Sequence, residues 1–185
     1  MSLFQKAKLM DIKETDLQLI LDWRNQESIR KVMYNSDIIL LDEHIRWFES
    51  LRKSEKAISK IFYYENIPFG VININQIDKT NKKCEWGFYI GNKNAPRGMG
   101  TVLGFISLNY IFDDLSMRKV NAEVLSMNEK SISLHRKLGF TQEGLLRKHI
   151  IKDKNYIDIY LFGLLQEEWK GKSDYIKSVI KGRYL

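Results

Sequence analysis

A glycine-rich turn near the middle of the chain has the residue types of an anion-binding site. Arg97-Gly98-Met99-Gly100 precedes residues 101–115, a strongly apolar segment with helical spacing. The first N–H groups of a helix lack partners within it, and they lie at the positive end of its dipole. Glycine lets a phosphate approach such a backbone closely, and Arg97 adds a positive charge. We therefore expect residues 97–101 to bind a phosphate or pyrophosphate, although an ordinary turn before a buried helix would also explain the glycines.

The same turn excludes two other kinds of phosphate-binding loop. A Walker loop ends in Gly-Lys-Ser or Gly-Lys-Thr, and this turn has no such ending. A dinucleotide fingerprint needs a third glycine within a parallel strand–helix–strand unit, and neither condition is met.

A carboxylate and an imidazole twelve residues apart could together move protons. Glu123 lies in residues 119–127, whose alternation is typical of a strand, and it shares a face with Asn121 and Leu125. A carboxylate on an inner strand face is costly unless it is paired or used. His135 follows in the next helix, and an imidazole gives or takes a proton near neutrality. We expect a strand–helix crossover to bring both to one cleft, with Glu123 as the base and His135 as the acid. The alternative is that His135 only packs or positions a ligand.

The elements that must position these residues predict one mixed α/β domain over residues 1–185. Helical spacing covers residues 14–30, with a break at Trp23-Arg24-Asn25, and Asp42 is expected to cap a second helix. Asn128 is expected to cap a third helix and Gly139 to end it. The remaining patterns predict helices at 101–115 and 166–181, and strands at 59–64, 68–76, 84–90, 119–127, 141–151 and 156–164.

Composition limits the class of protein. The chain is 44% apolar and 29% charged, which allows a core, and no apolar run approaches the ~20 residues of a membrane span. Its one cysteine, Cys84, is expected in the core, and the scattered histidines predict no metal site. The net charge of +7 suits anionic partners. We expect a cytoplasmic protein, a monomer or homodimer, that binds no membrane and needs no metal.

Residues 128–140 carry a more specific pattern, Asn-Glu-Lys-Ser-Ile-Ser-Leu-His-Arg-Lys-Leu-Gly-Phe. After a glycine-rich turn, this pattern resembles the GNAT acyltransferase superfamily, and the resemblance extends over residues 6–165, leaving the helix at 166–181 outside it. It implies a central mixed sheet, splayed and flanked by helices. It also implies an enzyme that transfers an acetyl group directly from acetyl-coenzyme A (acetyl-CoA) to an amine.

The same resemblance implies where the coenzyme lies. The pantetheine arm would enter between splayed strands at 85–90 and 121–127. The residues expected to contact the coenzyme are Phe88, Ile90, Arg97, Gly98, Met99, Gly100, Thr101, Asn128 and Ser131. The family commonly has Gln or Arg where this chain has Ala95, and Arg97 is expected to compensate. The family often has Tyr at the position of His135, placed to protonate the departing thiolate, which supports the acid role of His135.

A closer resemblance concerns the acceptor. Trp23-Arg24-Asn25, Met33-Tyr34-Asn35, His44 and residues 152–158 are similar to one branch of this superfamily. That branch acetylates the 4-amino group of UDP-linked 4-amino-4,6-dideoxy sugars in pseudaminic acid biosynthesis. The residues expected to face such an acceptor are Arg24, His44, Asn73, Asn75, Gln76 and Tyr89.

Two other functions remain open at this point. Relatives that acetylate protein or ribosomal-protein N-termini share the early Trp23-Arg24 pair, so that pair alone does not separate the two acceptors. A non-enzymatic nucleic-acid-binding domain would use the positive charge, but the chain has no helix-turn-helix or RNA-binding signature. We therefore expect a small-molecule amine, not a nucleic acid, as the partner.

Overall fold

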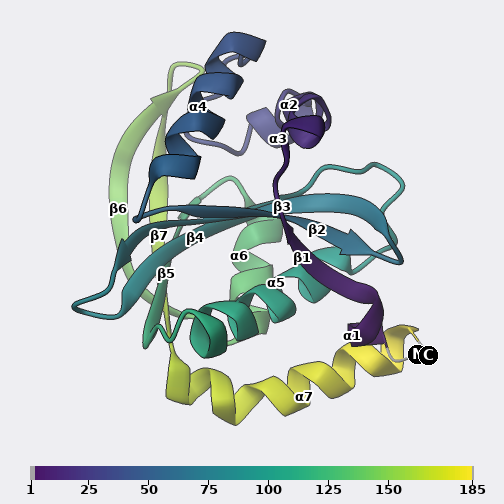
Figure 1. Cartoon of the computed structure of the whole chain (residues 1–185). Helices are drawn as coiled ribbons and strands as arrows, with labels where there is room; N and C mark the ends of the chain where they lie inside the picture. Colours follow the sequence, from purple (N-terminus) through teal and green to yellow (C-terminus); the bar gives the residue numbers. More distant parts are fainter. Residues whose placement is uncertain (1–2, 185) are drawn as a thin grey trace.

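The computed structural model describes residues 3–184, and within them one mixed sheet of seven strands forms the centre of the molecule (Figure 1). The strand order is β1-β2-β3-β4-β5-β7-β6, in which β4 and β5 are parallel and every other neighbouring pair is antiparallel. The strands are β1 (Ala7–Asp11), β2 (Ile58–Tyr64), β3 (Ile67–Asp78), β4 (Lys83–Ile90), β5 (Lys119–Leu125), β6 (Thr141–Lys152) and β7 (Asn155–Leu165). The predicted mixed sheet flanked by helices is confirmed.

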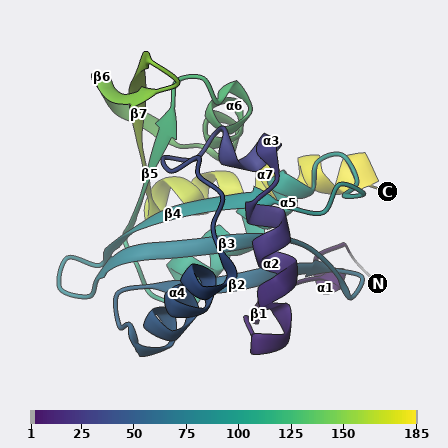
Figure 2. The same cartoon turned by 90° about the horizontal axis from the view of Figure 1, so that it is seen from above.

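Helices cover both faces of this sheet. On one side lie α2 (Leu17–Arg24), α3 (Glu27–Arg30) and α4 (Leu41–Lys53), and on the other lie α5 (Met99–Asn109), α6 (Glu129–Leu138) and α7 (Gln166–Tyr184) (Figure 1). The short α1 (Leu3–Lys6) precedes β1. Seen from above, the connection between α3 and α4 crosses the face of the sheet (Figure 2). None of the described helices is both long and apolar enough to cross a membrane.

The parallel pair β4 and β5 separates after a short ladder. Only Lys83, Cys84 and Glu85 pair with β5, and the last partner of β4 is Asn121. Beyond this point the two strands diverge, which confirms the predicted splay. Alternation places Cys84 in the core and Glu85 on the opposite face, the one that α2 to α4 cover.

The main differences from the sequence prediction are a missed strand, a helix cap and the extent of one helix. Strand β1 was not predicted, because its five residues alternate only weakly between apolar and polar types. Helix α4 begins at Leu41, and the Glu43 carboxylate accepts the N–H of Leu40 at 2.9 Å, so Asp42 is not the cap. The helix predicted at 101–115 begins at Met99 and ends in a π-helical turn, Tyr110–Asp114.

Both predicted ends of α6 are confirmed. The side chain of Asn128 accepts the N–H of Ser131 at 3.2 Å and so satisfies one free donor of the first turn. Gly139 ends the helix at φ +96°, a conformation that favours glycine. The sequence therefore fixes where α6 starts and stops beside β5.

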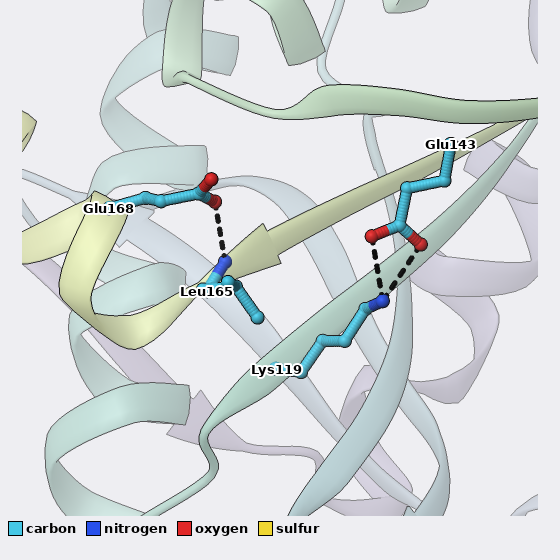
Figure 3. Close-up of polar contacts among 4 residues, drawn as sticks. All are labelled: Lys119, Glu143, Leu165 and Glu168. Carbon is cyan, nitrogen blue, oxygen red and sulfur yellow. Dashed lines mark hydrogen bonds and ion pairs between the residues drawn. The ribbon is translucent and has the colours of Figure 1, made fainter.

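Polar contacts anchor the end of the sheet away from the splay (Figure 3). Lys119, at the start of β5, donates to both carboxylate oxygens of Glu143 on β6 at 2.7 and 2.8 Å. A Cβ on Gly163 would approach that carboxylate to 2.3 Å, so glycine makes room for it. Glu168 accepts the N–H of Leu165 at 2.9 Å where β7 passes into α7. These contacts hold the start of β5 while its other end leaves β4.

Candidate active site

A cavity of about 1260 Å³ lies where β4 and β5 separate. Its walls come from the outward face of β3, β4 and β5, from α2, α4 and their connection, and from the start of α6. Among the residues predicted for the site, the cavity is lined by Arg24, His44, Asn73, Asn75, Phe88, Tyr89, Ile90, Gly100, Glu123, Asn128, Ser131 and His135.

The glycine-rich turn borders this cavity at Gly100. Gly98 adopts φ +100°, which glycine permits, and α5 starts directly after it. The N–H of Met99 is bonded to Pro96 at 3.2 Å and that of Thr101 to Gly98 at 2.8 Å. The turn therefore offers fewer unpaired N–H donors than the sequence predicted.

Two other features of the turn fit a coenzyme pyrophosphate. A Cβ on Gly100 would meet Leu134 only at 3.5 Å, so the protein's own packing does not require glycine there. Open backbone at this point suits the close approach of a ligand. Lys137, which sequence reasoning missed, donates to the Thr101 hydroxyl at 3.1 Å and brings a positive charge to the first turn of α5, in addition to that of exposed Arg97. The side chain of Met99, by contrast, is buried in the core.

Glu123 is the first outward-facing side chain of β5 beyond the ladder with β4. It is exposed, so the sequence argument from the cost of burying a carboxylate does not apply, but it does line the cavity. Its carboxylate accepts a hydrogen bond from the hydroxyl of Tyr34, in the connection between α3 and α4. Burial, and then the charge of Glu123, raises the pKa of the neighbouring Glu85 carboxyl. The splay thus holds two carboxylates side by side, of which Glu123 is the more open to solvent.

His135 does not have the geometry of the predicted acid. The indole N–H of Trp86 donates to its Nε2 at 3.1 Å, so that nitrogen carries no proton. Its Nδ1 lies 2.8 Å from the carbonyl of Ser131, which only an N–H can satisfy. Burial among aromatic rings lowers the pKa of His135 to about 4. The ring is neutral near pH 7 with both nitrogens engaged, which contradicts its role as an imidazolium donor and favours the positioning alternative.

Arg24 and His44 reach the cavity from the helices above the sheet. Arg24 donates through Nη2 to the carbonyl of Asn35 at 2.9 Å, while its Nη1 is buried without a partner. His44 is 4% exposed, stacks on Trp47, and has a buried Nε2 that also lacks a partner. Burial lowers the pKa of both side chains, although a bond from His44 to the backbone of Leu17 opposes the shift.

The strand residues predicted for the acceptor divide into two groups. Asn73, Asn75 and Tyr89 line the cavity, and Asn73 accepts the hydroxyl of Ser59 at 2.6 Å. Gln76 does not, because it follows Asn75 directly and neighbouring strand residues point to opposite faces; β3 is also irregular at this point, where Gln76 adopts φ +50°. It lines a second hollow of about 560 Å³, so the structure does not bring it together with the other residues predicted for the acceptor.

Cys84 lies in the core, as predicted. It is 1% exposed, and burial raises the pKa of its thiol to about 12. Within residues 3–184, no group of three or more His, Cys, Asp and Glu side chains could hold a metal ion.

Comparison with known proteins places this geometry in a family. A family model described as an acetyltransferase (GNAT) domain matches residues 9–161. Acetyltransferase PseH of Campylobacter jejuni is 31% identical over 132 residues, which are 71% of this chain and 80% of that protein. The putative ribosomal N-acetyltransferase YdaF of Bacillus subtilis is 28% identical over 109 residues, which are 59% of this chain and 60% of that protein.

A solved structure shares the fold over nearly its whole length. It is the spermidine N-acetyltransferase from Vibrio cholerae in complex with CoA and spermine, with a TM-score of 0.84 and 19% identity. The match covers 90% of this chain and 99% of that one. With the family model, these comparisons confirm the resemblance seen in the sequence: the chain belongs to the GNAT family of acetyltransferases and is an N-acetyltransferase.

Proposed function

We propose that this enzyme uses acetyl-CoA to acetylate the 4-amino group of a UDP-linked 4-amino-4,6-dideoxy sugar. The observation that carries the proposal is the pair of unpartnered buried atoms in the cavity, Nη1 of Arg24 and Nε2 of His44. Buried polar atoms almost always have partners, so a pair without them marks a place where a ligand supplies the partners. The 31% identity to acetyltransferase PseH agrees with the branch indicated by the sequence.

The two atoms differ in what they would bind. Nη1 of Arg24 is a charged donor, which suits a phosphate oxygen of a nucleotide sugar. His44 bonds to the backbone of Leu17, which leaves Nε2 of the neutral ring as an acceptor for a hydroxyl or for the N–H of a uracil ring. A nucleotide sugar offers both kinds of group.

The coenzyme's place follows from the residues on the other side of the cavity. Phe88 and Ile90 line the splayed end of β4, and Asn128 and Ser131 face them from α6, so the pantetheine arm would lie between these two sets. The pyrophosphate would lie at the turn 97–101, near Arg97 and Lys137. Bound there, acetyl-CoA supplies an activated acetyl thioester for direct transfer.

Proton transfer is the chemistry that the protein itself must supply. An amine arrives protonated near pH 7, and it becomes a nucleophile only when that proton is removed. Glu123 is a carboxylate at the mouth of the splay, between the acceptor side of the cavity and the coenzyme side. We assign it the role of base, acting directly or through one water molecule.

A polyamine acceptor is the second candidate. Five carboxylates line the same cavity, from Asp37, Glu43, Glu85, Glu123 and Glu129, and such a lining attracts a molecule with several ammonium groups. The structural neighbour from Vibrio cholerae was solved with spermine. The same charges oppose the phosphates of UDP, so the two candidates make opposite predictions for UDP binding.

Thermal unfolding with and without ligand separates them. Because a ligand that binds only the folded state raises its stability, millimolar UDP should raise the Tm of the wild type. In Arg24→Ala, UDP should no longer raise the Tm, whereas acetyl-CoA should raise it as it does in the wild type. Protection by spermidine and none by UDP would favour the polyamine, and protection only by a peptide N-terminus would favour a protein acceptor.

A further inference from the structure

The connection between α3 and α4 carries a tyrosine to the reaction centre. This segment, residues 31–40, is here named the acceptor loop, and it crosses the face of the sheet (Figure 2). Tyr34 extends from it and donates its hydroxyl to the carboxylate of Glu123. Tyr34 is 48% exposed, and both residues line the cavity. A single bond of this kind on an exposed loop is weak unless the loop itself is held.

Side chains from α2 and α3 hold the backbone of the acceptor loop. Arg24 donates to the carbonyl of Asn35 at 2.9 Å, and Arg30 donates to that of Ser36 at 2.6 Å. Asn25 bonds to both the N–H and the carbonyl of Ile39, each at 2.9 Å. These hydrogen bonds to the backbone hold the loop on either side of Tyr34 in place, and they do not depend on the Tyr34 hydroxyl.

A lysine from the edge strand β6 binds the backbone of the residue next to Tyr34. Lys152, the last residue of β6, is 6% exposed, and its Nζ donates to the carbonyl of Met33 at 2.6 Å. It also lies 3.5 Å from the carbonyl of Arg30. Burial, as the largest cause, lowers the pKa of this lysine. A buried ammonium is costly unless it is paired, so these two carbonyls, with the charges of Asp153 and Asp37, stabilise Lys152 in this place against the opposing charge of Arg24.

We propose that Tyr34 is a positioning residue for Glu123, and that Lys152 fixes Tyr34 through the carbonyl of Met33. The proposal rests on the role of Glu123 as base. It extends the reaction centre from β5 to the acceptor loop and to the far end of the β6–β7 hairpin. Neither Tyr34 nor Lys152 was assigned a catalytic or binding role from the sequence.

The chemistry of the pair explains why such a contact helps. A phenol that donates to one carboxylate oxygen fixes the orientation of the group and leaves the other oxygen for the acceptor's ammonium group. Glu85 on β4 also lies near Glu123, and the negative charges of the two carboxylates repel each other. On the other side of Glu123, its pairing partner on β7 is the apolar Leu161.

The first test removes only the Tyr34 hydroxyl. Because a hydrogen bond to a charged group contributes more than a neutral one, Tyr34→Phe should lower kcat about tenfold. The KM for acetyl-CoA should not change, so the loss should appear in kcat alone. Tyr175→Phe, which alters a tyrosine that is 72% exposed on α7, is the matched control and should match the wild type.

The second test asks whether Lys152 acts through Tyr34. Lys152→Met should also lower kcat. In the double variant Tyr34→Phe/Lys152→Met, the logarithm of kcat should fall by much less than the sum of the decreases in the two single variants. Lys154→Met, an exposed lysine in the turn of the same hairpin, is its control. Circular dichroism and Tm of every variant identify any that fails to fold.

All rates are measured with whichever amine the wild type acetylates fastest among a UDP-linked amino sugar, spermidine and an N-terminal peptide. A wild type that prefers spermidine or the peptide refutes the proposed acceptor and leaves this test intact. Two results would overturn the inference. One is a folded Tyr34→Phe protein with wild-type kcat, and the other is an undiminished effect of Tyr34→Phe in a Glu123→Gln background.

Discussion

Trp86 on β4 donates its indole N–H to Nε2 of His135 on α6, at 3.1 Å, and so joins the strand to the helix behind the cavity. The two rings meet edge to face at 88°. This bond makes His135 part of the wall that positions Ser131 and the start of α6. It also assigns the ring a tautomer that cannot donate a proton from Nε2.

His135→Phe should therefore affect stability more than catalysis. The substitution leaves the buried indole N–H of Trp86 without an acceptor, which costs about 1–3 kcal/mol of unfolding free energy. We expect kcat to stay within a few-fold of the wild type, because the neutral ring has no proton to give. Denaturant unfolding and steady-state kinetics on the same preparation check this. A kcat lowered by two orders of magnitude in an equally stable protein would restore the acid role.

The same residue predicts how stability depends on pH. The pKa of His135 is lowered by burial from its ordinary 6.5 to about 4 in the folded protein. The unfolded chain therefore binds a proton at a higher pH than the folded chain does, and stability falls as the pH drops from about 6.5 towards 4. His135→Phe should have a smaller decrease in Tm over this window than the wild type. Parallel curves for the two proteins would show that His135 is not the group responsible.

Gly100 tests the coenzyme turn. A Cβ there makes only an ordinary contact with Leu134, so Gly100→Val should fold, while its bulk blocks the approach of a pyrophosphate. We expect the affinity for acetyl-CoA, measured by calorimetry, to fall about tenfold or more. Gly171→Val on α7 is the control, since a Cβ there meets nothing within 4 Å. Equal affinities in the two folded variants would place the pyrophosphate elsewhere.

Cys84 should be chemically silent in the native protein. Its thiol is 1% exposed with a pKa raised to about 12, and only the thiolate reacts with alkylating agents. Native protein treated with iodoacetamide should therefore keep its full activity and mass, and the unfolded chain should gain one label. Rapid labelling of the folded enzyme with loss of activity would give Cys84 a role in the reaction.

Most of the scaffold was predictable because local patterns determine it. The cap at Asn128, the stop at Gly139 and the alternation of β4 and β5 each depend on residue types close together in the chain. The splay followed from the family resemblance, and the ladder that ends at Glu85 confirms it. Strand β1 has no comparable pattern, because it is an edge strand defined by its pairing with β2.

The site was less predictable because its decisive contacts join distant segments. Tyr34 and Glu123 are 89 residues apart, and the lysine that holds the acceptor loop comes from 119 residues beyond Met33. The role expected for His135 came from its residue type and family position, and neither reveals that Trp86 occupies its Nε2. Gln76, by contrast, follows Asn75 directly in a predicted strand, and alternation already argues against placing both on the acceptor face.

The central claim is that the acceptor is an amino sugar linked to UDP. Release of the CoA thiol, followed with a UDP-linked 4-amino-4,6-dideoxy sugar, the same sugar without UDP, spermidine and an N-terminal peptide, tests it most directly. We predict the highest kcat/KM with the UDP-linked sugar, and a large loss of this preference in Arg24→Ala. Equal turnover of the free and UDP-linked sugars, or faster turnover of spermidine or the peptide, would contradict the account.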